Sequence, residues 1–147
     1  MESLLEQGKL TLIKAASVAG VTDVTSDVID TAGYAGVLMF TTFGVITGTA
    51  VTSIKAQEGD KADGSDMADL AGSGITVADD DDGQTFGIDL NRPRKRYVRL
   101  YVDRGTANAV IGEIYALKYG AHSRPVTNSV VDTLTAKQLT SPLEGTP

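Results

Sequence analysis

The most constraining stretch of this chain is a strictly alternating run in its last third, followed by a second β-rich run. The apolar members of the alternation are Val98, Leu100 and Val102, and the residues between them are Tyr97, Arg99 and Tyr101. A period of two is typical of a strand with one buried face. Gly105 interrupts the pattern and Ala109–Tyr119 resumes it. We therefore expect a hairpin of two long strands within 91–126, with the rest of the chain packed around it.

The remainder of the chain reads as short β-prone segments separated by turns. Further strands are expected in the ranges 9–18, 22–30, 37–43, 49–58, 75–78 and 84–90. Val37–Phe43 is almost continuously apolar, which predicts a central strand covered on both faces. Leu4 and Leu5 are placed in one helical turn, and Ser65–Leu70 in another.

Composition favours an all-β architecture. Sixteen glycines indicate many turns, and a length of 147 residues suits one domain. Aromatic residues make up 5% and Trp is absent, so Val, Leu, Ile and Ala must build the core. About eight strands, with turns roughly every ten residues, predict an antiparallel β-sandwich of jelly-roll type. We divide the chain into an N-terminal arm (1–8), the sandwich (9–126) and an extended C-terminal arm (127–147).

Charge and cysteine content exclude several classes of protein. The net charge is −6, which disfavours nucleic acid as a partner because phosphate binding requires a basic surface. No Cys is present, so disulfides and thiol chemistry are ruled out. The N-terminus, MESLLEQGKLTLIK, lacks the apolar run of a signal peptide, and no stretch reaches the roughly 18 apolar residues of a membrane span. We expect a soluble protein made in the cytoplasm, with no membrane partner.

The search for reactive chemistry gives two weak candidates. Asp79–Asp82 followed by Gly83 suggests a calcium loop, but the spacing fails the EF-hand pattern and a solvated loop that discourages edge pairing explains it as well. His122 is the lone histidine, and no nucleophile-elbow or phosphate-loop motif accompanies it. We therefore expect no catalytic residue, no metal and no cofactor, and we do not expect an enzyme.

A basic cluster precedes the alternating run. Arg92, Arg94, Lys95 and Arg96 form it, and the two tyrosines and the arginine that alternate after it would share one strand face. Binding of single-stranded nucleic acid, contact with a protein partner, and ordinary cross-strand pairing are the three interpretations; Tyr and Arg enrichment at interface hot spots favours protein contact over nucleic acid. The candidate partner contacts are Arg94, Arg96, Tyr97, Arg99, Tyr101, His122 and Arg124.

Four stretches, in this order and spacing, resemble small virion proteins of tailed phages, namely the head decoration or cement proteins and related minor structural proteins. They are Asp30–Leu38 (DTAGYAGVL), Val51–Glu58 (VTSIKAQE), Lys95–Arg99 (KRYVR) and His122–Val126 (HSRPV). The resemblance implies a jelly-roll sandwich on the outside of the capsid that bridges major capsid protein subunits, often as a dimer or trimer. The residues after Val126 depart from the pattern and suggest an added contact arm.

We therefore expect a structural virion protein located on the capsid surface. An adaptor or tube component of the neck or tail is the alternative within the virion. A carbohydrate-binding β-sandwich module, with calcium at the acidic loop, is the alternative of another class, although such sites usually stack sugars on exposed aromatic rings, often Trp.

Overall fold

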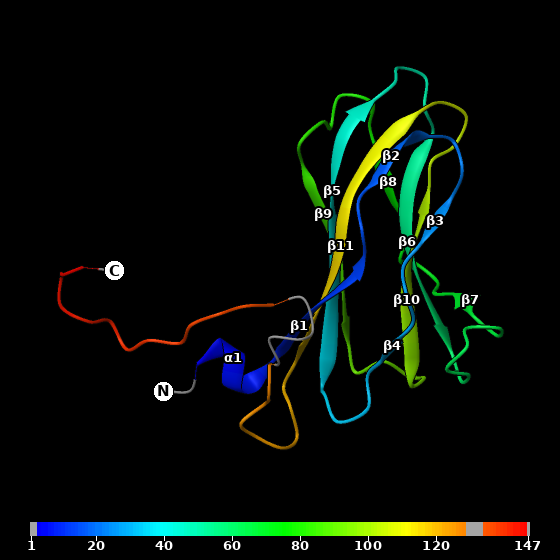
Figure 1. The fold of residues 1–147 in the computed structure, drawn as a ribbon. Coiled ribbons are helices and arrows are strands. Elements are labelled where there is room, and N and C mark those ends of the chain that lie inside the picture. The colour runs from blue at the N-terminus through cyan, green and yellow to red at the C-terminus, as the bar shows by residue number, and fades with distance from the viewer. Residues whose placement is uncertain (1–2, 129–133, 147) are drawn as a thin grey trace.

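The computed structural model describes residues 3–128 and 134–146, which fold into two antiparallel sheets packed face to face (Figure 1). One short helix, α1 (Leu4–Gln7), precedes the strands. The strands are β1 (Lys9–Lys14), β2 (Ser17–Gly20), β3 (Val24–Thr25), β4 (Ile29–Asp30), β5 (Gly36–Ile46), β6 (Thr52–Gly59), β7 (Ala68–Asp69), β8 (Ile75–Val77), β9 (Thr85–Asn91), β10 (Tyr97–Asp103) and β11 (Ala109–Tyr119). The predicted helical turn at Leu4 and Leu5 is thus confirmed.

The connectivity is that of a jelly roll. The first sheet has the order β1-β11-β5-β9, with β2 also paired to β11; the second has the order β3-β10-β6-β7, with β4 on β10 and β8 on β6. Three pairs of consecutive segments, β1 with β2, β3 with β4 and β7 with β8, each lie along one edge of the same partner strand, so each pair counts as one interrupted strand. Merging them leaves eight strands, four in each sheet, and the chain changes sheet at nearly every connection. The predicted all-β sandwich is confirmed.

The predicted hairpin of the last third is wrong. β10 and β11 lie in opposite sheets, and the turn between them carries the chain across the core. Gly105 (φ +65°) sits in this turn, where a Cβ would clash with the Val51 carbonyl oxygen. Alternation identifies a strand and its buried face, but it does not identify the partner strand. Here β10 pairs with β3, β4 and β6, and β11 pairs with β1, β2 and β5.

The core lies between the sheets and is aliphatic, as the composition predicts. Val98, Leu100 and Val102 are completely buried, as expected from the alternation. Across from them lie residues of β11 and β5, the largest of which are Met39 and Phe43. An edge-to-face contact between the rings of Phe43 and Phe86, with centroids 5.5 Å apart, closes the core toward β9.

β5 is longer than predicted, and one of its two faces is covered. Its inward residues, Val37, Met39 and Phe43, are buried, whereas Leu38 and Phe40 on the outer face are partly exposed. The prediction of a strand covered on both faces is therefore correct for the inner face and wrong for the outer one. Among the described residues, no element of the chain packs as a third layer on this sheet.

The polar insert after β6 also differs from its prediction. The helical turn expected at Ser65–Leu70 is wrong, because Ala68 and Asp69 form β7 and pair with β6. The Asp66 carboxylate accepts hydrogen bonds from the backbone amides of Asp60 (2.9 Å) and Lys61 (3.1 Å). These bonds close the insert into a loop and leave an extended segment to join the edge of the second sheet.

The two terminal segments meet beside the first sheet. The backbone amides of Ala121 and Val126 donate to the carbonyls of Gln7 (3.1 Å) and Glu6 (3.0 Å), so the chain after β11 is bonded to α1. Beyond it, residues 134–146 form an extended arm that runs away from the sandwich (Figure 1). The part of the chain that the structure describes has no helix long and apolar enough to cross a membrane.

Candidate functional site

The basic loop between β9 and β10 forms one wall of a groove at the end of the sandwich where β5 begins. We call this the basic groove; its volume is about 500 Å³ and its lining residues are Thr31–Ala35, Arg92–Arg96 and His122. Four hydrogen bonds hold the walls together, one of which runs from the Thr31 amide to the Arg96 carbonyl (2.9 Å). The Arg92 amide donates to the Ala35 carbonyl (2.8 Å), the His122 amide to the Gly33 carbonyl (2.9 Å), and the Thr31 hydroxyl to the Arg96 carbonyl (2.7 Å).

Two of the cations in the basic groove are neutralised by carboxylates of the same chain. Arg96 donates two hydrogen bonds to Asp30, at 2.9 and 2.8 Å, and this pairing lowers the pKa of Asp30 to about 2. Lys95 pairs with Asp60 at 3.0 Å, which raises the pKa of the lysine. These two side chains therefore position the loop and add little net charge to the groove.

Arg92 and Arg94 supply the uncompensated charge. Both are exposed, and neither forms an ion pair with a described residue. Arg92 has a φ of +55°, a conformation that non-glycine residues seldom adopt. The hydrogen bond from its backbone amide to the Ala35 carbonyl holds it in this conformation. A planar guanidinium group binds a carboxylate or phosphate through two parallel hydrogen bonds, so the groove is suited to an anionic partner group.

Tyr97, Arg99 and Tyr101 share the outer face of the second sheet, as predicted, and all three are half-buried. The Arg96 guanidinium lies 5.3 Å from the centroid of the Tyr97 ring. Arg99 donates to the Gln57 side chain (2.7 Å), which in turn donates to Asp69 (2.7 Å).

Tyr101 is held in the same way. Its hydroxyl donates to Asp23, a bond that raises the pKa of the tyrosine, and Lys55 lies 4.7 Å above its ring. These contacts match the cross-strand interpretation that the sequence left open. The role of the three side chains in partner contact stays a prediction.

The remaining predicted contacts lie apart from each other. His122 is exposed and lines the basic groove, whereas Arg124 is exposed outside it and donates to the Ala121 carbonyl (3.2 Å). The structure thus brings Arg94, Arg96 and His122 together in the groove and leaves Arg124 outside it. The sequence found the basic loop but missed its opposite wall, because nothing local links 31–35 to a loop sixty residues away.

The acidic loop after β8 is used within the fold. Asp79 accepts from the Thr49 amide (2.6 Å) and Asp82 from the Ile46 amide (3.0 Å). Asp81 accepts from the Ala78 amide (2.8 Å) and from the side-chain amide of Gln84 (2.7 Å). Within the described residues, no group of three or more His, Cys, Asp or Glu side chains is placed to hold a metal ion.

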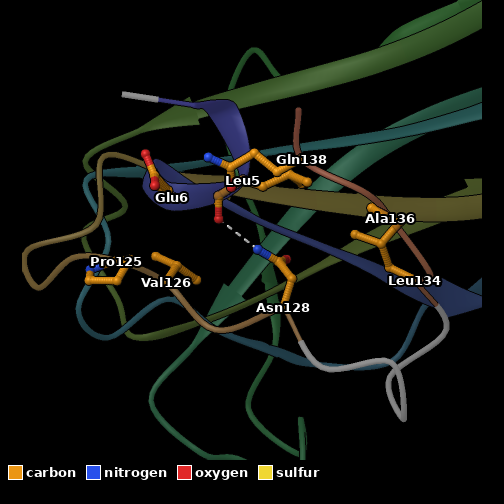
Figure 2. A pocket seen from close by; sticks show the side chains of 8 residues that line it. All are labelled: Leu5, Glu6, Pro125, Val126, Asn128, Leu134, Ala136 and Gln138. Carbon is orange, nitrogen blue, oxygen red and sulfur yellow. Dashed lines mark hydrogen bonds between the residues drawn. The ribbon is translucent and has the colours of Figure 1, made fainter. Parts of the chain in front are cut away.

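A second cavity, of about 270 Å³, lies where the C-terminal arm returns past α1 (Figure 2). Asn128 donates from its side-chain amide to the carbonyls of Leu5 (2.8 Å) and Gly8 (3.2 Å). On the other side of α1, hydrogen bonds from Ser3 and then Gln138 lower the pKa of Glu6. The cavity therefore marks a junction that attaches both ends of the chain to the first sheet.

Comparisons with known proteins add little to this description. Neither the protein-family models nor the curated proteins contain a match. One solved structure, described as a Bacillus endospore appendage from a family of disulfide-linked pili, has 14% sequence identity and a TM-score of 0.45. The similarity covers 79% of this chain and 90% of that one.

Proposed function

We propose that this chain is a structural virion protein that binds the outside of a tailed-phage head and bridges neighbouring major capsid protein subunits. The observation that carries the proposal is the basic groove, in which Arg92 and Arg94 face solvent without an ion pair among the described residues. A rigid sandwich with two free guanidinium groups at one end fits an acidic segment on a protein surface. The resemblance of the four sequence stretches supplies the identity of that surface.

The position of the groove supports a bridging role. His122 is bonded to the groove wall at Gly33, while the adjacent Ala121 is bonded to Gln7 at the end of α1. The groove and the root of the C-terminal arm are therefore at the same end of the sandwich (Figure 1). A protein that engages one capsid subunit through the groove presents its arm to a neighbouring molecule.

The experiment is cosedimentation of the purified protein with phage heads that lack it. Removing both groove charges (Arg92→Ala with Arg94→Ala) should weaken binding by about tenfold, equivalent to about 1.4 kcal/mol, and should reduce its salt dependence. The matched control removes two exposed lysine charges outside the groove (Lys14→Ala with Lys61→Ala) and should bind like the wild type.

Failure of the wild-type protein to bind heads, or its absence from purified particles, would contradict the proposal. Equal binding by the groove variant and the control would instead exclude the groove as the contact. Copy number separates the head from the neck or tail: hundreds of copies per particle indicate decoration of the shell, and a single ring of copies indicates an adaptor.

A further inference from the structure

The outer face of the first sheet is apolar where a solvent-facing surface is expected. Six side chains from three adjacent strands form two cross-strand rows, and each is partly exposed. One row is Leu10–Leu117–Leu38, and the other is Leu12–Tyr115–Phe40. The rings of Phe40 and Tyr115 are stacked, with centroids 5.8 Å apart. We call this surface the apolar face.

Antiparallel sheets with one solvated side usually alternate apolar residues inward with polar residues outward. β1, β5 and β11 all depart from this rule, so the additional outward apolar side chains form one continuous surface across three strands. Large side chains also lie across the glycines of neighbouring strands. The Val110 side chain occupies the space that a Cβ on Gly44 would need, and the Tyr119 ring does the same at Gly36. A contiguous apolar patch of this kind on a surface typically marks contact with another molecule.

The C-terminal arm has complementary chemistry. Leu139 and Leu143 are 61% and 97% exposed, which makes Leu143 the most exposed large apolar side chain among the described residues. The arm begins beside the apolar face, because Asn128 is bonded to the Gly8 carbonyl just before β1. Gln138 lines the cavity beside α1 together with Glu6, and the arm runs away from its own sandwich (Figure 1).

We propose that the arm of one copy lies across the apolar face of a second copy, with Leu139 and Leu143 as its anchors. Four residues of extended chain span about 13–14 Å, and three adjacent strands span about 10 Å, so two leucines at this spacing reach across β1, β11 and β5. Pro142 fixes its own φ and restricts Ser141 to extended conformations, which reduces the ordering cost of docking.

The occupant is a second copy because Leu139 and Leu143 of the described arm remain 61% and 97% exposed within their own chain. The hydrogen bonds from the Asn128 side-chain amide to the Leu5 and Gly8 carbonyls hold the start of the arm at α1, and residues 134–146 run away from the sandwich (Figure 1). If two copies exchange their arms, each arm covers the apolar face of the other copy, and the result is a symmetric dimer. The inference goes beyond the proposed function and does not depend on it, since it concerns the isolated protein.

The first test is sedimentation of the full chain across a concentration series. The wild type should form dimers, and the arm variant (Leu139→Asp with Leu143→Asp) should raise the dissociation constant at least about tenfold, because each buried leucine loses its apolar contact. The control places two aspartates at exposed valines outside the strands of this sheet (Val21→Asp with Val51→Asp) and should associate like the wild type. A monomeric wild type, or an arm variant that associates normally, overturns the inference.

The second test identifies the contact directly, because the chain has no cysteine. A chain with Leu139→Cys is mixed under oxidising conditions with a chain carrying Leu10→Cys on the apolar face. A mixed disulfide between the two chains is expected, and its yield should exceed that with a chain carrying Val51→Cys, an exposed position outside this sheet. Equal yields with the two partners would show that the arm does not dock on the apolar face, even if the protein dimerises.

Discussion

Replacing Arg104 should reveal the largest single polar contribution to the stability of this fold. The side chain is 7% exposed and lies just after β10, in the turn that crosses the core. Its Nε donates to the Thr22 carbonyl (2.5 Å), and its Nη1 donates to the carbonyls of Val18 (2.6 Å) and Ala109 (3.1 Å). One guanidinium group therefore ties the second sheet to β2, to β11 and to the loop after β2.

The magnitude follows from these three bonds. A hydrogen bond to a charged group contributes about 1.5–3 kcal/mol, but bonds that share one group are not additive. Arg104→Met keeps most of the apolar stem and leaves three backbone carbonyls without their donor, so we expect a loss of about 4 kcal/mol. Arg104→Lys keeps the charge but cannot fork to three separate segments, and should lose about 2 kcal/mol.

Urea unfolding, followed by circular dichroism at one fixed protein concentration, measures both losses. With a slope of about 2 kcal/mol per molar urea, the midpoint of Arg104→Met should fall by about 2 M. Arg94→Met provides the control, because this arginine is exposed and its replacement should cost less than about 0.5 kcal/mol. A loss below about 1 kcal/mol for Arg104→Met, or equal losses for both variants, would refute the assignment.

Three further predictions concern ionisable groups. Arg96 lowers the pKa of Asp30 from 3.8 to about 2, so the stabilising contribution of this pair is complete above about pH 4 and is lost as the pH falls toward 2. Asp30→Asn should therefore reduce the loss of stability between pH 4 and pH 2. An unchanged loss in that range would contradict the pairing. Burial and the hydrogen bond to Asp89 raise the pKa of Tyr119 from 10.0 to about 12, so the stabilising contribution of Tyr119 is complete below pH 10 and is lost as the pH rises toward 12. In an ultraviolet titration, Tyr119→Phe should lack one phenol that ionises late in the wild type. A titration curve identical to that of the wild type would contradict the raised pKa. Asp82→Ala should cost about 1–2 kcal/mol by leaving the last amide of β5 without its acceptor, and calcium should not change the melting temperature of the wild type; a calcium-dependent rise would show a cation site in the acidic loop.

Local patterns in the sequence were sufficient to predict the long strands and the core, but not the short strand β7. The alternation around Val98, Leu100 and Val102 identified both a strand and its buried face, because the period of two is a direct consequence of strand geometry. The aliphatic composition likewise predicted the core, and the density of turns predicted the sandwich. These are properties that a short window of sequence contains.

The pairing of strands was not predictable in the same way. β10 and β11 are consecutive and both alternate, yet they lie in different sheets, because in a jelly roll each crosses to a partner far away in the sequence. The basic groove depends on the same long-range pairing, since β4 beside β10 and β5 beside β9 bring its two walls together. Arg104 was missed for a related reason. An arginine in a turn resembles a solvated charge until the carbonyls around it are known.

The apolar outer face of β5 is the point at which sequence and structure disagree most usefully. The run Val37–Phe43 predicts cover on both sides, and the described chain provides it on one. If a second copy supplies the missing layer through its arm, a chain truncated after Asn128 should bind a hydrophobic dye more strongly than the full chain, while its melting temperature changes little. The full-length variant with Leu139→Asp and Leu143→Asp should show the same rise in dye fluorescence, because it keeps the arm but loses the anchors. Equal dye binding by all three proteins would mean that the arm does not cover this face, and that the two apolar rows are occupied by another partner or remain open.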